Sequence, residues 1–552
     1  DALGVARGLA AFAVIAAGLA AIVLLSPRTT LGGLVPLEKP PAVLADRAQQ
    51  IIGSLGYTER AADTAYSMSR QDDFLRYVAQ TDQSPTRWNT LKTGSPAVVR
   101  FWYRTSPRPL VPERAAREVS ITDPPLIVSG MTLIKLDTRG RLQEFTAVPP
   151  QFERDPEPAT GPKWDALFGA AGLQMERFAP AEPQWTPRDF ADVRAAWEGP
   201  LPDHPDVRVR VEAASYRGRP VSFLVAGPWT RSSRMAVDAP STAETVLLTL
   251  IVILVIALCV AGLLLARHNV RARRADTAGA ARLVVFVLIG SSAAWLVAAH
   301  HVPDAFAEMT GFSHVLAGDL FTTGVLWILY LALEPYVRRF WPDAMLGWTR
   351  LISGRLRDPR VGRDVLASGV IVVILGVGGA LYAVVPPLFG KAPDAPLAGA
   401  EVFTLVSLPA LFARVWDDLL SSLFVSMFLV LGFVVLRLIF RRMSIAVAVA
   451  LVLFAVVQGG QVIYSETSPW IAGAFQLFII STVTVAIVRY GLLTTVVALT
   501  LANVLNDVPL TPHVTHWTGT TSNLAIAFAI GVAAFGYYAS RGGEPLFGDL
   551  EV

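Results

Sequence analysis

Long apolar runs are the dominant pattern along this chain. A run of about 18 or more apolar residues is long enough to cross the roughly 30 Å hydrocarbon layer of a membrane as a helix. The runs lie at 8–25, 243–266, 283–299, 315–333, 365–385, 419–436, 445–463, 470–488, 492–506 and 523–538. We therefore expect a mainly α-helical polytopic membrane protein with about ten transmembrane helices. The run 492–506 is the shortest and ends among polar residues, and its loss would reverse only the last helix.

Between residues 28 and 242 the pattern changes to short elements separated by proline and glycine, which favours an α+β domain. The expected elements are helices at 43–55 and 164–173, a strand at 97–104, and hairpins that pair 131–136 with 141–148 and 207–213 with 220–226. One interpretation is two helix-plus-hairpin units related by duplication. A single α+β domain is the other.

These patterns divide the chain into three parts. Residues 1–27 form an N-terminal signal-anchor helix, because the first apolar run is followed by proline and arginine and not by a small-residue cleavage site. Residues 28–242 form the α+β domain inserted after that helix. Residues 243–552 form a nine-helix transmembrane domain.

The positions of Lys and Arg indicate how the chain is threaded, because short cytoplasmic loops are enriched in these residues. Beyond Pro240, arginines concentrate in alternate connections, and the other connections hold only Lys391 and Arg414. The expected location is the bacterial cytoplasmic (inner) membrane, with both termini cytoplasmic and residues 28–242 extracytoplasmic.

Composition and motifs exclude several classes of function. The chain is 53% hydrophobic and 16% charged, whereas soluble domains average roughly 25% charged residues. A net charge of +3 is too small to indicate nucleic acid, and the single cysteine, Cys259, excludes an internal disulfide framework. The chain carries no P-loop, zinc-protease, serine-hydrolase or protein-kinase catalytic motif. We therefore predict no catalytic residue and no cofactor, and leave open whether the protein acts within an enzyme.

The strongest local signal is an amphipathic basic segment at 335–364, which we expect to be a cytoplasmic loop. Its aromatic and aliphatic residues gather on one side of a helix and arginines flank them, as in a helix that lies on an anionic leaflet. The residues concerned, together with the preceding acid, are Glu334, Pro335, Arg338, Arg339, Trp341, Trp348, Arg350, Arg355, Arg357 and Arg363. Topological anchoring alone is one interpretation. Contact with a cytoplasmic partner domain, with Pro335 as a hinge, is the other.

Two further groups are candidate binding residues. Arg100, Trp102 and Arg104 form a candidate ligand patch in the α+β domain, because guanidinium and aromatic groups suit anionic or planar ligands. A strand that alternates between core and surface is the simpler interpretation. Five histidines fall at predicted outer ends of helices, where imidazoles could bind a metal or respond to pH. They are His300, His301, His314, His513 and His516. Ordinary polarity of outer loops is the simpler interpretation.

Several short segments resemble the membrane and extracytoplasmic regions of bacterial membrane-bound, receptor-like serine/threonine protein kinases. They are LEPYVRR at 333–339, WTRL at 348–351, GRLRDP at 354–359, VGRD at 361–364, LGY at 55–57, RFWYR at 100–104, SPRPL at 106–110 and GPWT at 227–230. The resemblance implies a kinase inside the cell, a sensor outside and several spans between. This chain lacks the kinase domain, so no catalytic residue can be transferred, and kinase activity would require sequence upstream of Asp1.

The leading hypothesis is a multi-pass bacterial inner-membrane signalling or sensor protein, the sensing and membrane portion of a receptor-like kinase. An accessory or scaffold subunit of a larger membrane complex and a transporter are the alternatives. The expected partners are the lipid bilayer, with anionic lipid at the basic segment, and a cytoplasmic kinase domain or other membrane subunits.

Overall fold

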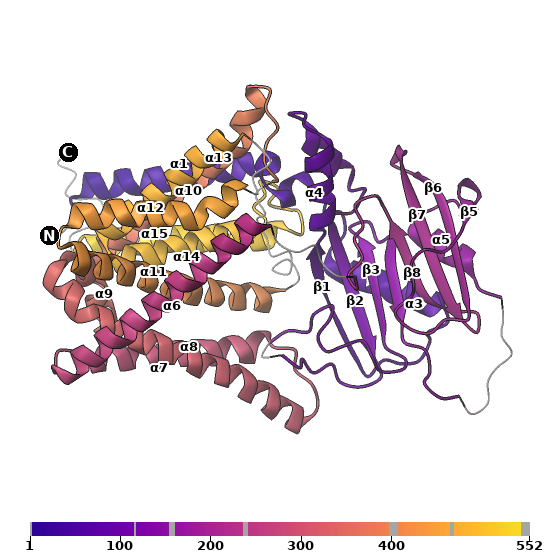
Figure 1. Cartoon of the computed structure of the whole chain (residues 1–552), viewed down its shortest axis with the longest axis horizontal. Helices are drawn as coiled ribbons and strands as arrows, with labels where there is room; N and C mark the ends of the chain where they lie inside the picture. Colours follow the sequence, from indigo (N-terminus) through magenta and orange to yellow (C-terminus); the bar gives the residue numbers. More distant parts are fainter. Residues whose placement is uncertain are drawn as a thin grey trace, which may run out of the picture.

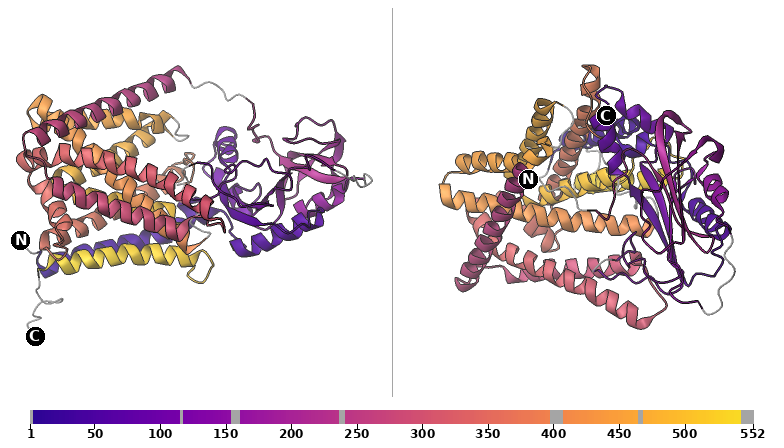
Figure 2. Two further views of the ribbon diagram at one scale, coloured as in Figure 1. Left: turned by 90° about the horizontal axis from the view of Figure 1, so that it is seen from below. Right: turned by 45° about the vertical axis from the view of Figure 1, so that its right-hand side comes forward.

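A bundle of long helices and a single β-sheet make up the protein (Figure 1). The computed structural model describes residues 3–114, 117–153, 161–235, 241–396, 407–463 and 468–542. The sheet stands beyond one end of the helices, and the turned view on the left of Figure 2 shows the same arrangement.

Each predicted apolar run coincides with one helix of the bundle. The long helices are α1 (Val5–Thr29), α6 (Thr242–Arg271), α7 (Thr277–Ala298), α8 (Ala305–Phe340), α10 (Pro359–Leu388), α11 (Leu408–Phe440), α12 (Met443–Ile463), α13 (Pro469–Val485), α14 (Leu492–Asp507) and α15 (Gly519–Ser540). Within the described residues, eight helices are long and apolar enough to cross a membrane, and α14 is a shorter apolar helix. The chain is thus a mainly helical membrane protein with one sheet.

The sheet has eight antiparallel strands in the order β1-β2-β3-β4-β8-β7-β6-β5. The strands are β1 (Asp63–Arg70), β2 (Val99–Ser106), β3 (Thr132–Asp137), β4 (Leu142–Ala147), β5 (Ala179–Ala181), β6 (Val193–Leu201), β7 (His204–Tyr216) and β8 (Arg219–Ala226). Short helices accompany them: α2 (Leu31–Leu34), α3 (Pro41–Ser54), α4 (Asp72–Thr81) and α5 (Trp164–Ala171), with 3-10 turns at Arg87–Thr93 and Met175–Arg177.

The sheet consists of two halves that meet side by side. The first half runs from α3 through β1 to β4, and the second runs from α5 through β5 to β8. The seam between them is the pairing of β4 with β8, where Phe145 lies opposite Phe223. Both predicted hairpins are present, as β3–β4 and β7–β8. The second turns at Arg217 and Gly218, which both have positive φ, as a type I′ turn requires.

One core spans the two halves of the sheet. Leu44 and Ile51 of α3 and Phe168 of α5 pack with Phe145 and Phe223 at the seam. A smaller cluster around Trp102 lies under the connection between β2 and β3. These two clusters bury both faces of β2, because Phe101 and Tyr103 belong to the main core while Trp102 belongs to the other.

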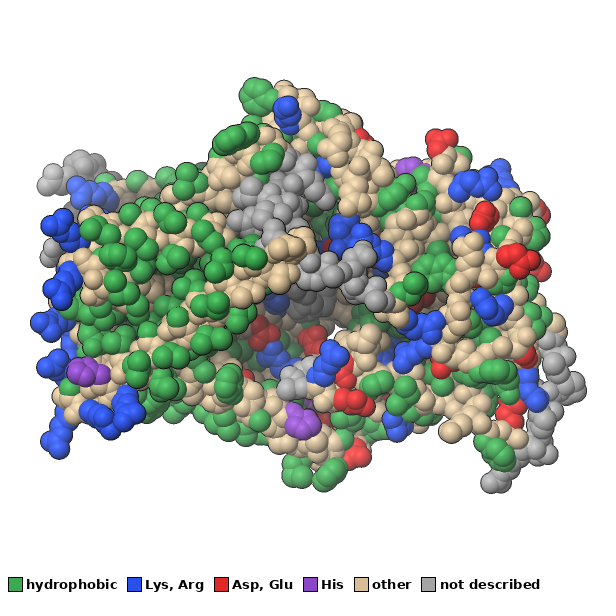
Figure 3. Space-filling view, viewed as in Figure 1, with side chains coloured by type: hydrophobic (Ala, Val, Ile, Leu, Met, Phe, Trp, Pro, Cys, Tyr) green, Lys and Arg blue, Asp and Glu red, His purple; other side chains and the backbone are tan. Residues whose placement is uncertain are grey.

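The two ends of the bundle differ in charge. At the end opposite the sheet, Leu3 donates a backbone hydrogen bond to Ser540 at 2.9 Å, so the first described residues lie beside the end of α15. Several long helices carry arginine at this end, for example Arg271 on α6 and Arg437 on α11. Figure 3 shows the resulting row of basic side chains along this edge of the molecule. We call it the arginine end.

The basic segment at 335–364 is largely helical, and the predicted amphipathic helix within it corresponds to α9 (Asp343–Ile352). Helix α8 continues through Pro335 to Phe340, a separate helix α9 spans Asp343–Ile352, and α10 begins at Pro359. Proline lacks the N–H that would bond to the carbonyl four residues earlier. Here Asn269 of α6, almost fully buried, donates to the carbonyl oxygens of Leu331 at 2.9 Å and Ala332 at 3.2 Å. The helix therefore passes Pro335 without interruption, and the predicted hinge position is attached to α6.

Candidate functional site

The contact between the sheet and the bundle brings together polar groups that are far apart in sequence. Asp63 at the start of β1 contacts His300, which follows α7, with 2.8 Å between the carboxylate and Nε2. The backbone N–H of His300 donates to the carbonyl of Arg117 at 2.9 Å. The guanidinium of Arg117 in turn pairs with Asp417 of α11. Two segments of the sheet domain, the start of β1 and the β2–β3 connection, are thus attached to the sheet-facing ends of α7 and α11.

Two tryptophans extend this contact to other helices. The indole N–H of Trp88 donates to the carbonyl of Asp394, beyond α10, at 2.7 Å. The indole N–H of Trp517, just before α15, donates to the carbonyl of Leu37 at 2.8 Å. Beside Trp88, the buried guanidinium of Arg87 donates to the carbonyl of Pro393.

We call the contacts of Asp63, Arg117, Arg87, Trp88 and Trp517 the docking interface. All of its residues on the sheet side belong to the first half of the sheet domain or to the segment before α3.

A buried ion-pair network lies next to the docking interface inside the bundle. Asp418, adjacent to Asp417, is almost fully buried and lies 3.1 Å from Nε of Arg414, one turn earlier on α11. Arg414 also pairs with Asp507 at the end of α14. Buried charges are tolerated only when they are paired, so the Arg414–Asp507 pair holds α11 against α14. This pair lies close to Asp417, to which Arg117 is attached.

The five predicted histidines are distributed over separate contacts. His300 belongs to the docking interface, His301 pairs with Glu308 at 2.8 Å, and His516 contacts Thr518 at 2.8 Å. His314 and His513 are exposed. Within the described part of the chain, no group of three or more His, Cys, Asp or Glu side chains is placed to hold a metal ion. The structure therefore does not assemble these histidines into one metal centre.

The candidate ligand patch lies inside the protein and is not an exposed surface. Arg100, Trp102 and Arg104 have exposed fractions of 8%, 4% and 0%. Arg104 donates to the carbonyls of Ser120 and Pro124, both at 2.6 Å, and so holds the β2–β3 connection over the sheet. Trp102 packs in the small core under that connection. Arg100 has a different environment, since it lines a cavity between the two halves of the sheet.

At the arginine end, the apolar residues of the basic segment pack into the bundle. Trp348 is 5% exposed and belongs to the main helical core, and the Trp341 indole donates to the carbonyl of Val488 at 3.2 Å. Glu334 is buried and lies 3.0 Å from Arg338. The apolar side of α9 is therefore covered by protein, where the sequence predicted contact with lipid.

The arginines of the same segment remain accessible to different degrees. Arg338, Arg339, Arg355 and Arg357 are exposed. Arg350 pairs with Asp358, and Arg363 lies 3.7 Å from the buried Asp364. The surface of this end is thus basic, and its interior combines apolar side chains with the buried acids Glu334 and Asp364. The surface can present positive charge to an anionic partner.

Comparison of the chain with protein-family models, with curated proteins and with solved structures found no match. The resemblance to receptor-like kinases stays a prediction, based on the segments quoted above.

Proposed function

We propose that this chain is the sensing and membrane-spanning portion of a receptor-like signalling protein in a bacterial inner membrane. The α+β domain at 28–242 faces the outside of the cell, and the arginine end faces the cytoplasm, in line with the preference of arginine for that side. The observation that carries the proposal is the docking interface, in which the sheet domain contacts the ends of several bundle helices directly.

The proposed mechanism is a change in the orientation of the sheet domain that moves the helix ends attached to it. A ligand shifts such an equilibrium only if it contacts the two states differently. Helices α11 and α14 pass the displacement along the bundle, because the buried pairs of Arg414 hold them together. At the arginine end, the hydroxyl of Thr494 on α14 donates to the carbonyl of Asp364 on α10 at 3.0 Å, beside Gly347 of α9.

The partner at the arginine end is a cytoplasmic domain, which the resemblance implies to be a protein kinase. The exposed arginines Arg338, Arg339, Arg355 and Arg357 supply positive charge for that contact and for anionic lipid.

A scaffold subunit of a larger membrane complex is the second candidate. It is favoured by α6, whose apolar residues Leu248, Val252 and Ile256 are exposed along the helix. Partner helices or lipid would cover them.

The signalling proposal is tested by breaking the docking interface and measuring backbone hydrogen exchange in α9. In the full chain in lipid nanodiscs, Arg117→Asp places two carboxylates together. We expect faster exchange both near 388–396 and in α9. The charge swap Arg117→Asp with Asp417→Arg should restore the slower rates. Arg208→Asp, an exposed change on β7, is the matched control.

Unchanged exchange in α9, with the docking interface opened, would show that the sheet domain does not communicate with the arginine end. That result would favour the scaffold role.

A further inference from the structure

Arg100 is a buried charge without a side-chain partner in the described part of the chain. Its side chain is 92% buried, since only 8% of its surface is exposed, and its Nε is fully buried without a hydrogen-bond acceptor. Among the described residues, no side chain forms an ion pair with it. A guanidinium stays protonated under ordinary conditions, so the structure holds a positive charge in an interior position where such charges are normally paired.

The acidic side chains around Arg100 form ion pairs with other basic residues. Asp73, Asp137 and Glu144 act on it electrostatically. Asp137 accepts from Arg141 at 2.6 Å, Glu144 from Lys135 at 2.8 Å, and Asp73 from Arg76 at 2.5 Å. Burial nevertheless lowers the pKa of Arg100 from its ordinary value, so these acids do not compensate fully for the loss of water.

Arg104 shows that this strand can satisfy a buried arginine. It lies four residues further along β2, on the same side of the strand. Its Nε also lacks an acceptor, but its two terminal nitrogens donate to carbonyl oxygens. Burial in β2 therefore does not by itself leave the terminal nitrogens of an arginine without acceptors. The surroundings of Arg100 are the cause.

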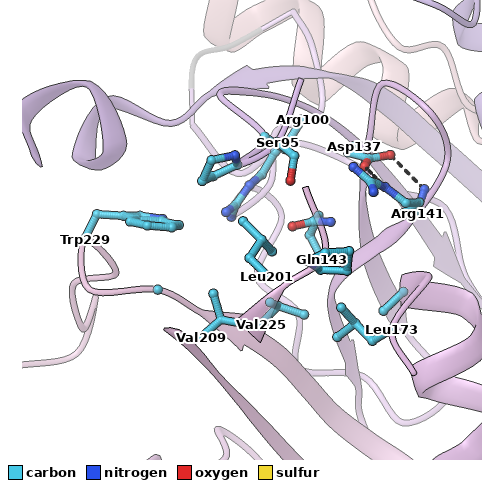
Figure 4. A pocket seen from close by; sticks show the side chains of 15 residues that line it. Ser95, Arg100, Asp137, Arg141, Gln143, Leu173, Leu201, Val209, Val225 and Trp229 are labelled. Atoms are coloured by element: carbon cyan, nitrogen blue, oxygen red, sulfur yellow. Dashed lines mark hydrogen bonds and ion pairs between the residues drawn. The ribbon is translucent and has the colours of Figure 1, made fainter. Parts of the chain in front are cut away.

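A cavity lies beside Arg100 at the junction of the two halves of the sheet (Figure 4). Ser95, Arg100 and Gln143 line it from the first half, and Leu201, Val209 and Val225 line it from the second half. Figure 4 shows the guanidinium of Arg100 reaching between Trp229 and Gln143. One side of the cavity is therefore polar and positively charged, and the other is aliphatic.

The size of the cavity limits what it can hold. The volume open to water is about 30 Å³, and a single water needs about 10–15 Å³ by this measure. Two or three water-sized groups fit, which corresponds to a carboxylate with a very short carbon tail. Tetrahedral oxyanions such as sulfate are larger.

We propose that this cavity binds the carboxylate of a small organic acid, with Arg100 as its counter-charge and Leu201, Val209 and Val225 around its carbon tail. A guanidinium and a carboxylate form two parallel charge-assisted hydrogen bonds. Ser95 and Gln143 provide additional polar contacts. The bound acid joins the two halves of the sheet, and the first half carries the docking interface. The inference rests on the proposed function for its purpose, since the acid would be the ligand that the sensor detects.

Acetate is the probe for the test. The full chain in nanodiscs of zwitterionic lipid is titrated with acetate at constant ionic strength, with sulfate as the background anion, and binding is measured by calorimetry and by the midpoint of thermal unfolding. We expect a saturable rise of the midpoint for the natural chain. Chloride in place of acetate, over the same sulfate background, should give a smaller rise.

Two variants and one control locate the binding. Arg100→Gln should weaken acetate binding roughly tenfold or more, because charge-assisted hydrogen bonds are lost, while the unliganded variant should unfold no earlier than the natural chain. Val225→Phe fills the cavity and keeps Arg100, and should also abolish the response. Arg208→Gln on β7, an exposed arginine, should leave it unchanged.

An acetate response that persists in Arg100→Gln and Val225→Phe would overturn the proposal, and so would a response to chloride alone. If Arg100→Gln lowers the unfolding midpoint without any acetate effect in the natural chain, Arg100 is a structural residue. The exchange experiment on Arg117 uses no ligand, so its outcome is independent of this one.

Discussion

The two ends of the helix bundle use charged residues in opposite ways. At the sheet end, Asp417 and His300 are engaged by a second folded domain, and their partners Arg117 and Asp63 come from about 240 to 300 residues away in the sequence. At the arginine end, Arg355 and Arg357 are exposed while the apolar side of α9 is buried. The sheet end of the bundle is thus covered by a domain of the same chain. At the arginine end, the apolar side chains are packed inside the bundle and the basic surface is exposed.

The largest expected effect concerns the core of the arginine end. Trp348→Ala removes a side chain that is 5% exposed, and should lower the free energy of unfolding by about 3–5 kcal/mol. Denaturation in mixed micelles measures the change. Arg355→Ala, at an exposed position of the same segment, should change it by no more than about 0.5 kcal/mol. A similarly small effect for Trp348→Ala would mean that this face points to lipid, as the sequence alone suggested.

A smaller effect is expected at the sheet end from Trp88→Phe. Phenylalanine keeps most of the packing but removes the indole N–H that donates to the carbonyl of Asp394. Leaving that carbonyl without its donor should cost about 1–2 kcal/mol, and hydrogen exchange should quicken around 388–396. Trp185→Phe in the second half is the matched control, because Trp185 lies outside the docking interface. Equal effects of the two changes would show that the Trp88 contact does not hold the domain in place.

The smallest expected effect is a pH dependence at the sheet end. His301 lies between α7 and α8, with Nδ1 beside Glu308 and Nε2 beside the carbonyl of Leu296, so both nitrogens donate when the ring is protonated. The hydrogen bond with Glu308 raises the pKa of His301. The pair therefore stabilises the fold fully below the unfolded pKa of about 6.5, and this contribution disappears as the pH rises through the higher folded pKa.

The His301 prediction is checked by comparing thermal unfolding on either side of that pH range. The midpoint should fall as the pH rises, and the part of the fall due to His301 should be absent in His301→Gln. His314→Gln, at an exposed position on α8, should keep the full fall. A natural chain and a His301→Gln variant with the same pH profile would rule out this contribution.

Apolar periodicity was sufficient to locate the helices, and turn residues located the two hairpins. Each apolar run coincides with a helix, and Arg217-Gly218 forms the predicted turn. Strand β1 was missed, because its sequence DTAYSMSR is mostly polar and it lies at the edge of the sheet. The three-residue β5 and the continuous path of α8 through Pro335 were also missed. The latter depends on Asn269, which is 62 residues from Leu331.

The candidate site was harder to predict than the fold, because its contacts join distant parts of the chain. Sequence spacing cannot show that Arg117 meets Asp417. It also cannot show that the terminal nitrogens of Arg104 donate to two carbonyls while Arg100, on the same strand, has no side-chain partner among the described residues. The amphipathic pattern around Trp348 was read correctly as one-sided. The sequence could not show whether lipid or protein covers that side, since both are apolar.

The orientation of the two ends across the membrane is the central claim, and cysteine accessibility tests it most directly. Cys259 on α6 is the single cysteine of the chain, so Cys259→Ser provides a background without thiols. Ser232→Cys then marks the sheet domain and Ser353→Cys marks the arginine end, both at exposed positions. The account predicts that a membrane-impermeant maleimide labels intact spheroplasts at residue 232, and reaches residue 353 only after the membrane is opened. Labelling of both positions in intact spheroplasts, or of residue 353 alone, would contradict it.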